Sequence, residues 1–209
     1  MLYQYLQSNY TPNEPIFASE LQVDGLSDVN VRAQLKKLTD AGLLKRFDKG
    51  IYFIPKQSIF KSGSQLSSDM VLEKKYLQEN NTRCGYVSGL LFANQLGLTT
   101  QVPMVFEVVS NKATTDYRET SLGKARVIVR KPRTTITEQN YTALQFLDLM
   151  KDVDMLSELE ASERENVLKS YLQKSGLTFA KLDEYLPLYP DKVFRNLYES
   201  RLLYGISAQ

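Results

Sequence analysis

Histidine is absent from the sequence, and cysteine occurs once, at Cys84. A chain without histidine cannot form a Ser-His-Asp or Cys-His catalytic group or a histidine-ligated metal site, which excludes many hydrolases and metalloenzymes. A single cysteine cannot form an internal disulfide, and this usage fits a reducing cytosol. We expect no catalytic residues, no bound metal and no cofactor.

Long apolar segments are also lacking. No run approaches the roughly 20 apolar residues that a membrane helix requires, and the first residues, MLYQYLQSNYTPNE, lack the basic start and apolar core of a signal peptide. We therefore expect a cytoplasmic protein with no membrane partner. The 209 residues are 43% hydrophobic and 24% charged, an ordinary globular composition that allows one large domain or two modest ones.

The net charge of +2 conceals two basic zones and one acidic zone. Residues 32–56 contain seven basic and two acidic side chains, and residues 112–133 contain the same numbers. Residues 148–165, DLMKDVDMLSELEASERE, reverse the balance with seven acids and two bases. The basic zones are candidates for contact with a polyanion, whereas the acidic zone is expected to be a solvated surface.

Residues 1–56 are predicted to form a winged helix-turn-helix domain of three helices and a hairpin. LYQYLQSNY is expected to be a short amphipathic helix, and EPIFASELQ, with a proline near its start, is expected to be the second. Ser27 suits the N-cap of a third helix that ends before Gly42. Strands over residues 43–46 and 51–54 then form the hairpin.

The third helix is the predicted DNA-reading element. With Val31, Leu35 and Leu38 turned inward, its opposite face presents polar and basic side chains at helical spacing. Arg32 suits bidentate contacts to guanine and Asn30 to adenine, whereas lysines suit phosphates. The predicted DNA-binding residues are Ser27, Asn30, Arg32, Ala33, Lys36, Lys37, Arg46 and Lys49. The alternative is that these charges form an ordinary solvated helix face.

Residues 57–68 are polar and rich in serine and glycine, and are predicted to be a linker. Residues 69–209 are predicted to be a mixed α/β domain with a small sheet and a helical C-terminal part, which makes the whole chain α+β. Its first segment, SSDMVLEKKYLQEN, is expected to be a capped helix. Two β-branched runs, MVFEVVS and ARVIVRK, are expected to be strands joined by a polar connection, and another helix is expected from about 87 to 96.

Two short segments of this second domain allow alternative interpretations. In GYVSGLLFANQLGLTTQVP, the glycines are expected to permit close approach to another backbone, although Tyr86 and Ser88 could instead line an anion site at a helix N-terminus. In KARVIVRKPR, the basic side chains either extend a nucleic-acid footprint or lie on the exposed face of an antiparallel strand. These candidate additional contacts are Lys124, Arg126, Arg130 and Lys131.

LKKLTDAGLLKRFDKGIYFIP followed by GYVSGLLFANQLGLTTQVP resembles the AbiEi-like antitoxin family of type IV toxin–antitoxin systems. The similarity continues through VFEVVSN, ARVIVRKPRTTITEQN and LQFLDLMKD, and spans about residues 16–152. The resemblance implies a DNA-binding autorepressor that counters a nucleotidyltransferase-like toxin, in phage defence, without forming a stable complex with it. No catalytic residue is carried over. The family's recognition-helix and wing positions correspond to Asn30, Arg32, Lys36, Arg46 and Lys49.

Two other functions stay open beside this antitoxin hypothesis. One is a ligand-responsive winged-helix regulator whose C-terminal domain binds a small molecule, an idea that rests only on the domain architecture. The other is a nuclease tethered to DNA, for which Glu107, Asp116 and Glu119 are the candidate carboxylates. We expect a protein that is not an enzyme and whose main partner is double-stranded operator DNA. Neither the operator sequence nor the oligomeric state follows from the sequence.

Overall fold

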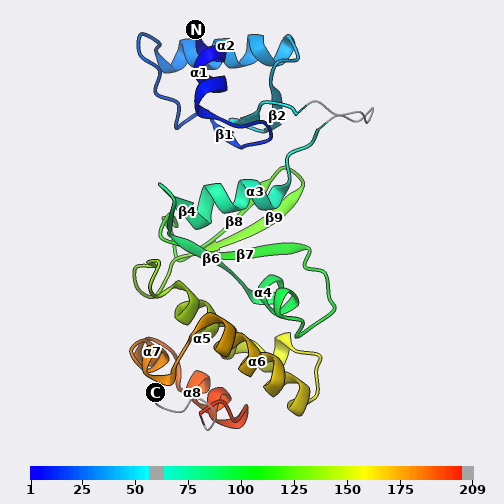
Figure 1. The fold of residues 1–209 in the computed structure, drawn as a ribbon, viewed down its shortest axis with the longest axis vertical. Helices are drawn as coiled ribbons and strands as arrows, with labels where there is room; N and C mark the ends of the chain where they lie inside the picture. The colour runs from blue at the N-terminus through cyan, green and yellow to red at the C-terminus, as the bar shows by residue number, and fades with distance from the viewer. Residues whose placement is uncertain (57–63, 204–209) are drawn as a thin grey trace. The chain divides into compact units, whose positions relative to one another are not determined.

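A computed structural model describes residues 1–56 and 64–203 of the chain (Figure 1). Its contacts divide the chain into two units, Met1–Lys74 and Lys75–Gln209, and each unit has its own hydrophobic core. Both units combine helices with a small sheet, so the predicted α+β class is confirmed. In the described residues, no helix is long and apolar enough to cross a bilayer.

The first unit has a three-stranded antiparallel sheet with the strand order β1-β3-β2. Leu6, Ile16, Val31 and Leu35 are buried together, which joins both long helices of this unit to the sheet. The inward positions predicted for Val31 and Leu35 are thereby confirmed, and Leu38 packs at the border of the cluster. The elements of this unit are α1 (Leu2–Asn9), β1 (Ile16–Phe17), α2 (Asp28–Asp40), β2 (Lys45–Asp48), β3 (Ile51–Phe53) and α3 (Ser68–Leu72).

The helix predicted over EPIFASELQ is wrong. Ile16 and Phe17 form strand β1, which pairs with Tyr52 and Ile51 of β3, and a turn follows immediately. A helix of nine residues is marginal without tertiary support. Pairing with β3 satisfies the backbone of β1 and buries both of its side chains, so the sheet is the more stable arrangement. The basic helix α2 is therefore the second helix of the described chain.

The predicted linker, residues 57–68, falls partly outside the described residues, because 57–63 are not among them. Residues 64–74, which follow this gap, belong to the first unit. Ser64 donates to Asn13 and accepts from the backbone N–H of Lys56 at 3.0 Å. Farther along, the Nζ of Lys74 lies 2.7 Å from a carboxylate oxygen of Glu14. These contacts lie within the first unit, which extends to Lys74.

The second unit is built on a mixed four-stranded sheet with the strand order β6-β7-β9-β8. Strands β7 and β9 run parallel, and the two edge strands are antiparallel to their neighbours. A π-helical turn (Glu73–Leu77) leads into this unit. Its elements are β4 (Gln78–Glu79), β5 (Thr82–Arg83), β6 (Gly85–Ser88), α4 (Gly89–Leu96), β7 (Val105–Ser110), β8 (Tyr117–Leu122), β9 (Ala125–Arg130), α5 (Tyr141–Leu156), α6 (Ala161–Ser175), α7 (Phe179–Asp183), a 3-10 turn (Leu186–Leu188) and α8 (Asp191–Glu199).

Both predicted strands of this unit are confirmed as β7 and β9, but the polar connection between them contains a strand that the sequence did not predict. Strand β8 pairs with β9 as a hairpin, closed where Leu122 faces Ala125. Its sequence, YRETSL, has no apolar residue at its centre, and only Leu122 is buried. The strand exists because β9 offers it a hydrogen-bonding partner, which is information that a local pattern does not contain.

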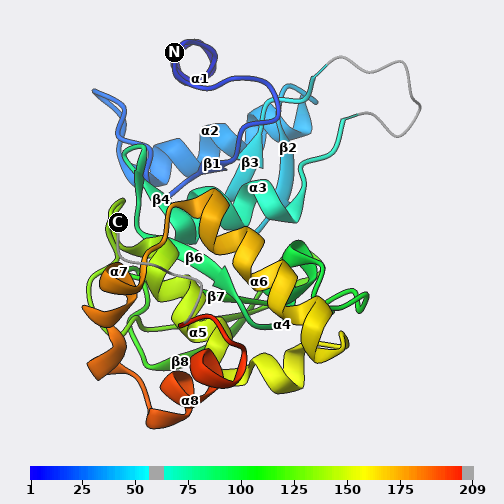
Figure 2. The same ribbon diagram turned by 60° about the horizontal axis from the view of Figure 1, so that its bottom comes forward.

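Helices α4 and α5 cover one face of the sheet, and α6, α7 and α8 pack against these two helices (Figure 1 and Figure 2). Tyr86 and Val109 point from the sheet into this core. Tyr171 of α6 packs against this core. Its ring centre lies 5.5 Å from that of Phe92 and 5.7 Å from that of Phe146. This aromatic cluster joins α4, α5 and α6, so the C-terminal helices share one core with the sheet.

The glycines of GYVSGLLFANQLGLTTQVP serve backbone geometry, as predicted. A Cβ on Gly85 would lie 2.3 Å from the carbonyl oxygen of Tyr76 and 2.8 Å from that of Val109, so only glycine fits there. Gly85 lies in strand β6, however, and the predicted helix begins later, at Gly89. A Cβ on Gly89 would come within 2.9 Å of the carboxylate of Glu107, so a carboxylate of the chain itself occupies the space beside this helix N-terminus.

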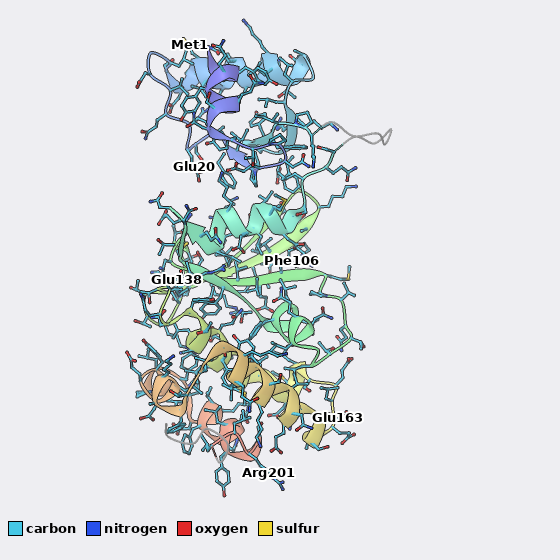
Figure 3. The ribbon with its side chains drawn as sticks, viewed as in Figure 1. Met1, Glu20, Phe106, Glu138, Glu163 and Arg201 are labelled. Atoms are coloured by element: carbon cyan, nitrogen blue, oxygen red, sulfur yellow. The ribbon has the colours of Figure 1, made fainter. Side chains whose placement is uncertain are left out.

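The loop after α4 is held by a single carboxylate. Glu158 accepts hydrogen bonds from the Thr99 hydroxyl, the Thr100 backbone N–H and the Gln101 amide, each at 2.8 Å. These bonds, led by the one from Gln101, lower the pKa of Glu158 to about 2. Part of the predicted acidic surface therefore has a structural role. Glu163, labelled in Figure 3, is by contrast exposed in the first turn of α6.

Candidate nucleic-acid interface

Helix α2 begins and ends where the sequence predicts. The hydroxyl of Ser27 accepts a hydrogen bond from the backbone N–H of Asn30 at 3.4 Å, and Asp28 lies in the first turn, where the helix dipole favours a carboxylate. Gly42 follows the helix with a φ of 73°, and the backbone N–H of Leu43 bonds to the carbonyl of Leu38 at 3.0 Å. The predicted site residue Ser27 thus has a structural role as the helix cap.

The outer face of α2 is open. Arg32, Lys36 and Lys37 are exposed, and so are Asn30 and Ala33. Val29, one turn before Ala33, is 73% exposed, so this face carries apolar surface as well as charge. Within residues 1–56 and 64–203, neither Arg32 nor Lys36 has an ion-pair partner. The structure therefore places five of the eight predicted side chains together on one accessible surface.

The hairpin β2–β3 carries two more of the predicted residues, and both are exposed. Arg46 donates from Nε to the carbonyl oxygen of Asp48 at 3.1 Å, which orients its side chain along the turn. The backbone N–H of Lys49 donates to the Asp48 carboxylate at 2.7 Å, and Gly50 completes the turn with a φ of 74°. The side chain of Lys49 is left at the tip of the hairpin. Lys45, in contrast, donates to the Ser64 carbonyl at 3.2 Å.

The four basic candidates of the second unit are exposed, but they are not equivalent. Arg126 lies 3.5 Å from a carboxylate oxygen of Glu119, and Arg130 lies 3.5 Å from one of Glu107. Strand β9 is an inner strand of the sheet, antiparallel to β8 and parallel to β7, and both arginines are on its exposed face. Lys124 belongs to the hairpin turn before β9, and Lys131 follows the strand.

Two of the three carboxylates considered for nuclease chemistry have partners within the chain. Glu107 pairs with Arg130, and Glu119 accepts a hydrogen bond from the Tyr117 hydroxyl. In the part of the chain that the structure describes, no three Cys, Asp or Glu side chains gather as a possible metal site.

Sequence reasoning missed a polar cluster in the second unit. Asp148 was expected to be solvated, but it is partly buried and accepts a hydrogen bond from the Tyr86 hydroxyl at 2.6 Å. Burial raises the pKa of Asp148, and burial beside this carboxylate raises the pKa of Tyr86 well above its ordinary value. The available signal was the position of Asp148 in α5, where the flanking residues 143–147 and 149–150 are all buried.

Comparison with known protein families gives a match to most of the chain. A family model described as a family of unknown function (DUF6088) matches residues 13–174, which include helix α2, the hairpin, the whole mixed sheet and α5. No curated protein matches the chain.

Proposed function

The chain belongs to this family of unknown function, and from that premise we propose that its first unit binds double-stranded operator DNA. The observation that carries the proposal is the open face of α2, with Arg32, Lys36 and Lys37 exposed and the hairpin bearing Arg46 and Lys49 directly after it. An unpaired basic helix face next to a basic β-ribbon is the footprint of a duplex-binding module.

The side chains divide into two roles in this proposal. Arg32 and Asn30 lie in the first half of α2 and read base edges in the major groove, as guanidinium and amide groups do through paired hydrogen bonds. Ala33 and Val29 let the helix approach the base edges closely. Lys36, Lys37, Arg46 and Lys49 contact phosphates, which hold the module in register on the duplex.

We also propose that the module is a reduced winged helix. Helix α2 acts as the recognition helix and the hairpin β2–β3 as the wing, as in winged helix-turn-helix proteins. The usual middle helix is replaced by strand β1 and a turn, so the sheet takes over the support of the recognition helix. The packing of Val31 and Leu35 against Ile16 of this strand supports that interpretation.

At the level of the cell, we propose a non-enzymatic cytoplasmic antitoxin that represses its own operon. The resemblance to AbiEi-like antitoxins supports this role, because it includes the residues of α2 and the hairpin. The partner is a nucleotidyltransferase-like toxin that acts in the same pathway, without a stable complex between the two proteins. The ligand-responsive regulator remains the alternative function.

The experiment that tests DNA binding is a gel shift with the DNA upstream of the protein's own gene. We expect a complex that survives an excess of unrelated competitor DNA and weakens as the salt concentration rises. Equal binding to competitor DNA would contradict the operator proposal. The antitoxin role is tested separately, by expressing the product of the adjacent gene with and without this protein. We expect the neighbouring product alone to arrest growth and co-expression of this protein to restore it.

A further inference from the structure

A cleft opens in the second unit where strand β9 ends beside helix α5, and its volume is about 300 Å³. Bases and carboxylates from distant parts of the chain meet there. The bases are Arg130, Lys131, Arg133 and Lys151, and the carboxylates are Asp116 and Asp148. Two of these cations are also paired with carboxylates outside the lining, Arg130 with Glu107 at 3.5 Å and Lys151 with Asp152 at 3.0 Å. The remaining positive charge, on Lys131 and Arg133, favours an anionic ligand.

The cations of this cleft differ in how firmly they are held. The guanidinium of Arg133 lies 4.7 Å from the ring centre of Tyr189 and donates to the Leu188 carbonyl at 3.0 Å, so its position is fixed. Arg130 is held between the Glu107 carboxylate and the ring of Tyr117. In the described residues, the Lys131 side chain has no ion pair or hydrogen-bond partner, which leaves it available to a ligand.

The inner part of the cleft is formed by a carboxylate supported by tyrosines. Asp148 accepts from the Tyr86 hydroxyl, and Tyr189 lies beside this pair with its own hydroxyl donating to the Leu144 carbonyl at 3.1 Å. The positive charges of Lys151, Arg133 and Arg130 favour the ionised form of Asp148, but none of these side chains lies within ion-pair distance of it. A partly buried acceptor without a direct cation partner can bind a donor group of a ligand.

We propose that this cleft binds a small phosphate-bearing ligand, such as a nucleotide. Its phosphate contacts Arg130, Lys131 and Lys151, and a hydroxyl or amino group of the ligand donates to Asp148. Guanidinium and ammonium groups are the usual partners of phosphate oxygens. This inference goes beyond DNA binding and does not depend on it, because all of its residues lie in the second unit.

Two observations favour a small ligand over the backbone of a nucleic acid. The volume of about 300 Å³ matches the lower end of small-molecule pockets and holds one phosphate with a sugar-sized group. A carboxylate at the inner end repels a continuous row of phosphates but accepts a hydrogen bond from a ligand hydroxyl. The cleft therefore combines one anion position with one donor position, which the sugar and phosphate of a mononucleotide fill while its base stays outside.

The test is a titration of the full-length protein, at ionic strength fixed with chloride, followed by the backbone amide NMR shifts of Arg130, Lys131, Arg133 and residues 148–151. The probes are inorganic phosphate, adenosine, adenosine 5′-monophosphate and a twelve-nucleotide oligothymidine. We expect saturable shifts with phosphate and with adenosine 5′-monophosphate, and none with adenosine. Equal shifts with adenosine, no response to phosphate, or a response to the oligonucleotide alone would each overturn the proposal.

Matched variants locate the site. Lys131→Gln and Lys151→Gln each remove one cation of the cleft, and we expect each to weaken adenosine 5′-monophosphate binding by about tenfold, the effect of one hydrogen bond to a charged group. Lys124→Gln removes the same charge from the other end of β9, outside the cleft, and binding should stay unchanged. Equal losses in all three variants would show non-specific attraction and overturn the assignment. Arg32→Ala should leave this binding intact even if it abolishes DNA binding.

Discussion

The most informative test of DNA binding is the salt dependence of a single hairpin variant, Lys49→Ala. In the proposed complex, four exposed cations contact phosphates: Lys36, Lys37, Arg46 and Lys49. Each phosphate that a protein neutralises contributes about −0.9 to the slope of log affinity against log salt, so four contacts give a slope of about −3.6. Removing Lys49 should change the slope to about −2.7.

The difference is large enough to measure by fluorescence anisotropy with labelled duplex. Over a fourfold rise in sodium chloride, we expect the affinity to fall about 150-fold for the unaltered protein and about 40-fold for the variant. The ratio between operator and unrelated DNA should stay the same, because a phosphate contact carries no sequence information. The curves should therefore shift in parallel for the two DNAs.

The matched control is Lys174→Ala, which removes an exposed positive charge from the last turn of α6. Both variants change the net charge equally, so a slope change in Lys49→Ala alone would indicate a direct contact. Indistinguishable slopes for the two variants would refute the placement of the hairpin on DNA.

Three further predictions concern other parts of the chain. Arg32→Ala should reduce the preference for operator over unrelated DNA by about 1–3 kcal/mol in competition binding; an unchanged preference would mean that another face of α2 reads the bases. Because its pKa is lowered from 4.5 to about 2, Glu158 contributes stability above its unfolded pKa and loses it as the pH falls through that interval. Between pH 5 and about pH 2, the unfolding free energy from urea titrations should therefore fall less for Glu158→Gln than for the unaltered protein. An equal fall in the two proteins would contradict the assignment. Gly85→Ala should destabilise the second unit by about 3 kcal/mol or more, since its Cβ meets two backbone oxygens. Gly97→Ala, with open space around a φ of 77°, should cost only about 1 kcal/mol of unfolding free energy; similar costs would contradict the close-contact argument.

The sequence predicted the elements whose signals are local. Helix α2 has its cap, its terminating glycine and its buried positions within 16 residues, from Ser27 to Gly42, and the structure agrees with all three. Strands β7 and β9 consist of β-branched runs, which are recognisable without knowledge of their neighbours. The exposed positions of Arg32 and Lys36 followed from the same helical spacing.

The remaining features depend on partners that are distant in the sequence. Strand β1 exists because β3, about 35 residues later, pairs with it. The polar cluster in the second unit needs Tyr86 and Asp148 side by side, and these residues are 62 positions apart. No periodicity within one segment encodes such a pairing, and for this reason the basic cleft was not predicted.

The polar sequence of strand β8 affects how the edge of the mixed sheet meets other molecules. It lies at the edge of the mixed sheet, where one side of its backbone has no strand beside it in the described chain. Such an edge invites a strand of another molecule to add to it, which leads to aggregation. Tyr117, Arg118 and Glu119 at its start are exposed, and the last two place charge along this border. The polar composition that conceals β8 from sequence patterns thus protects the sheet from unwanted intermolecular growth.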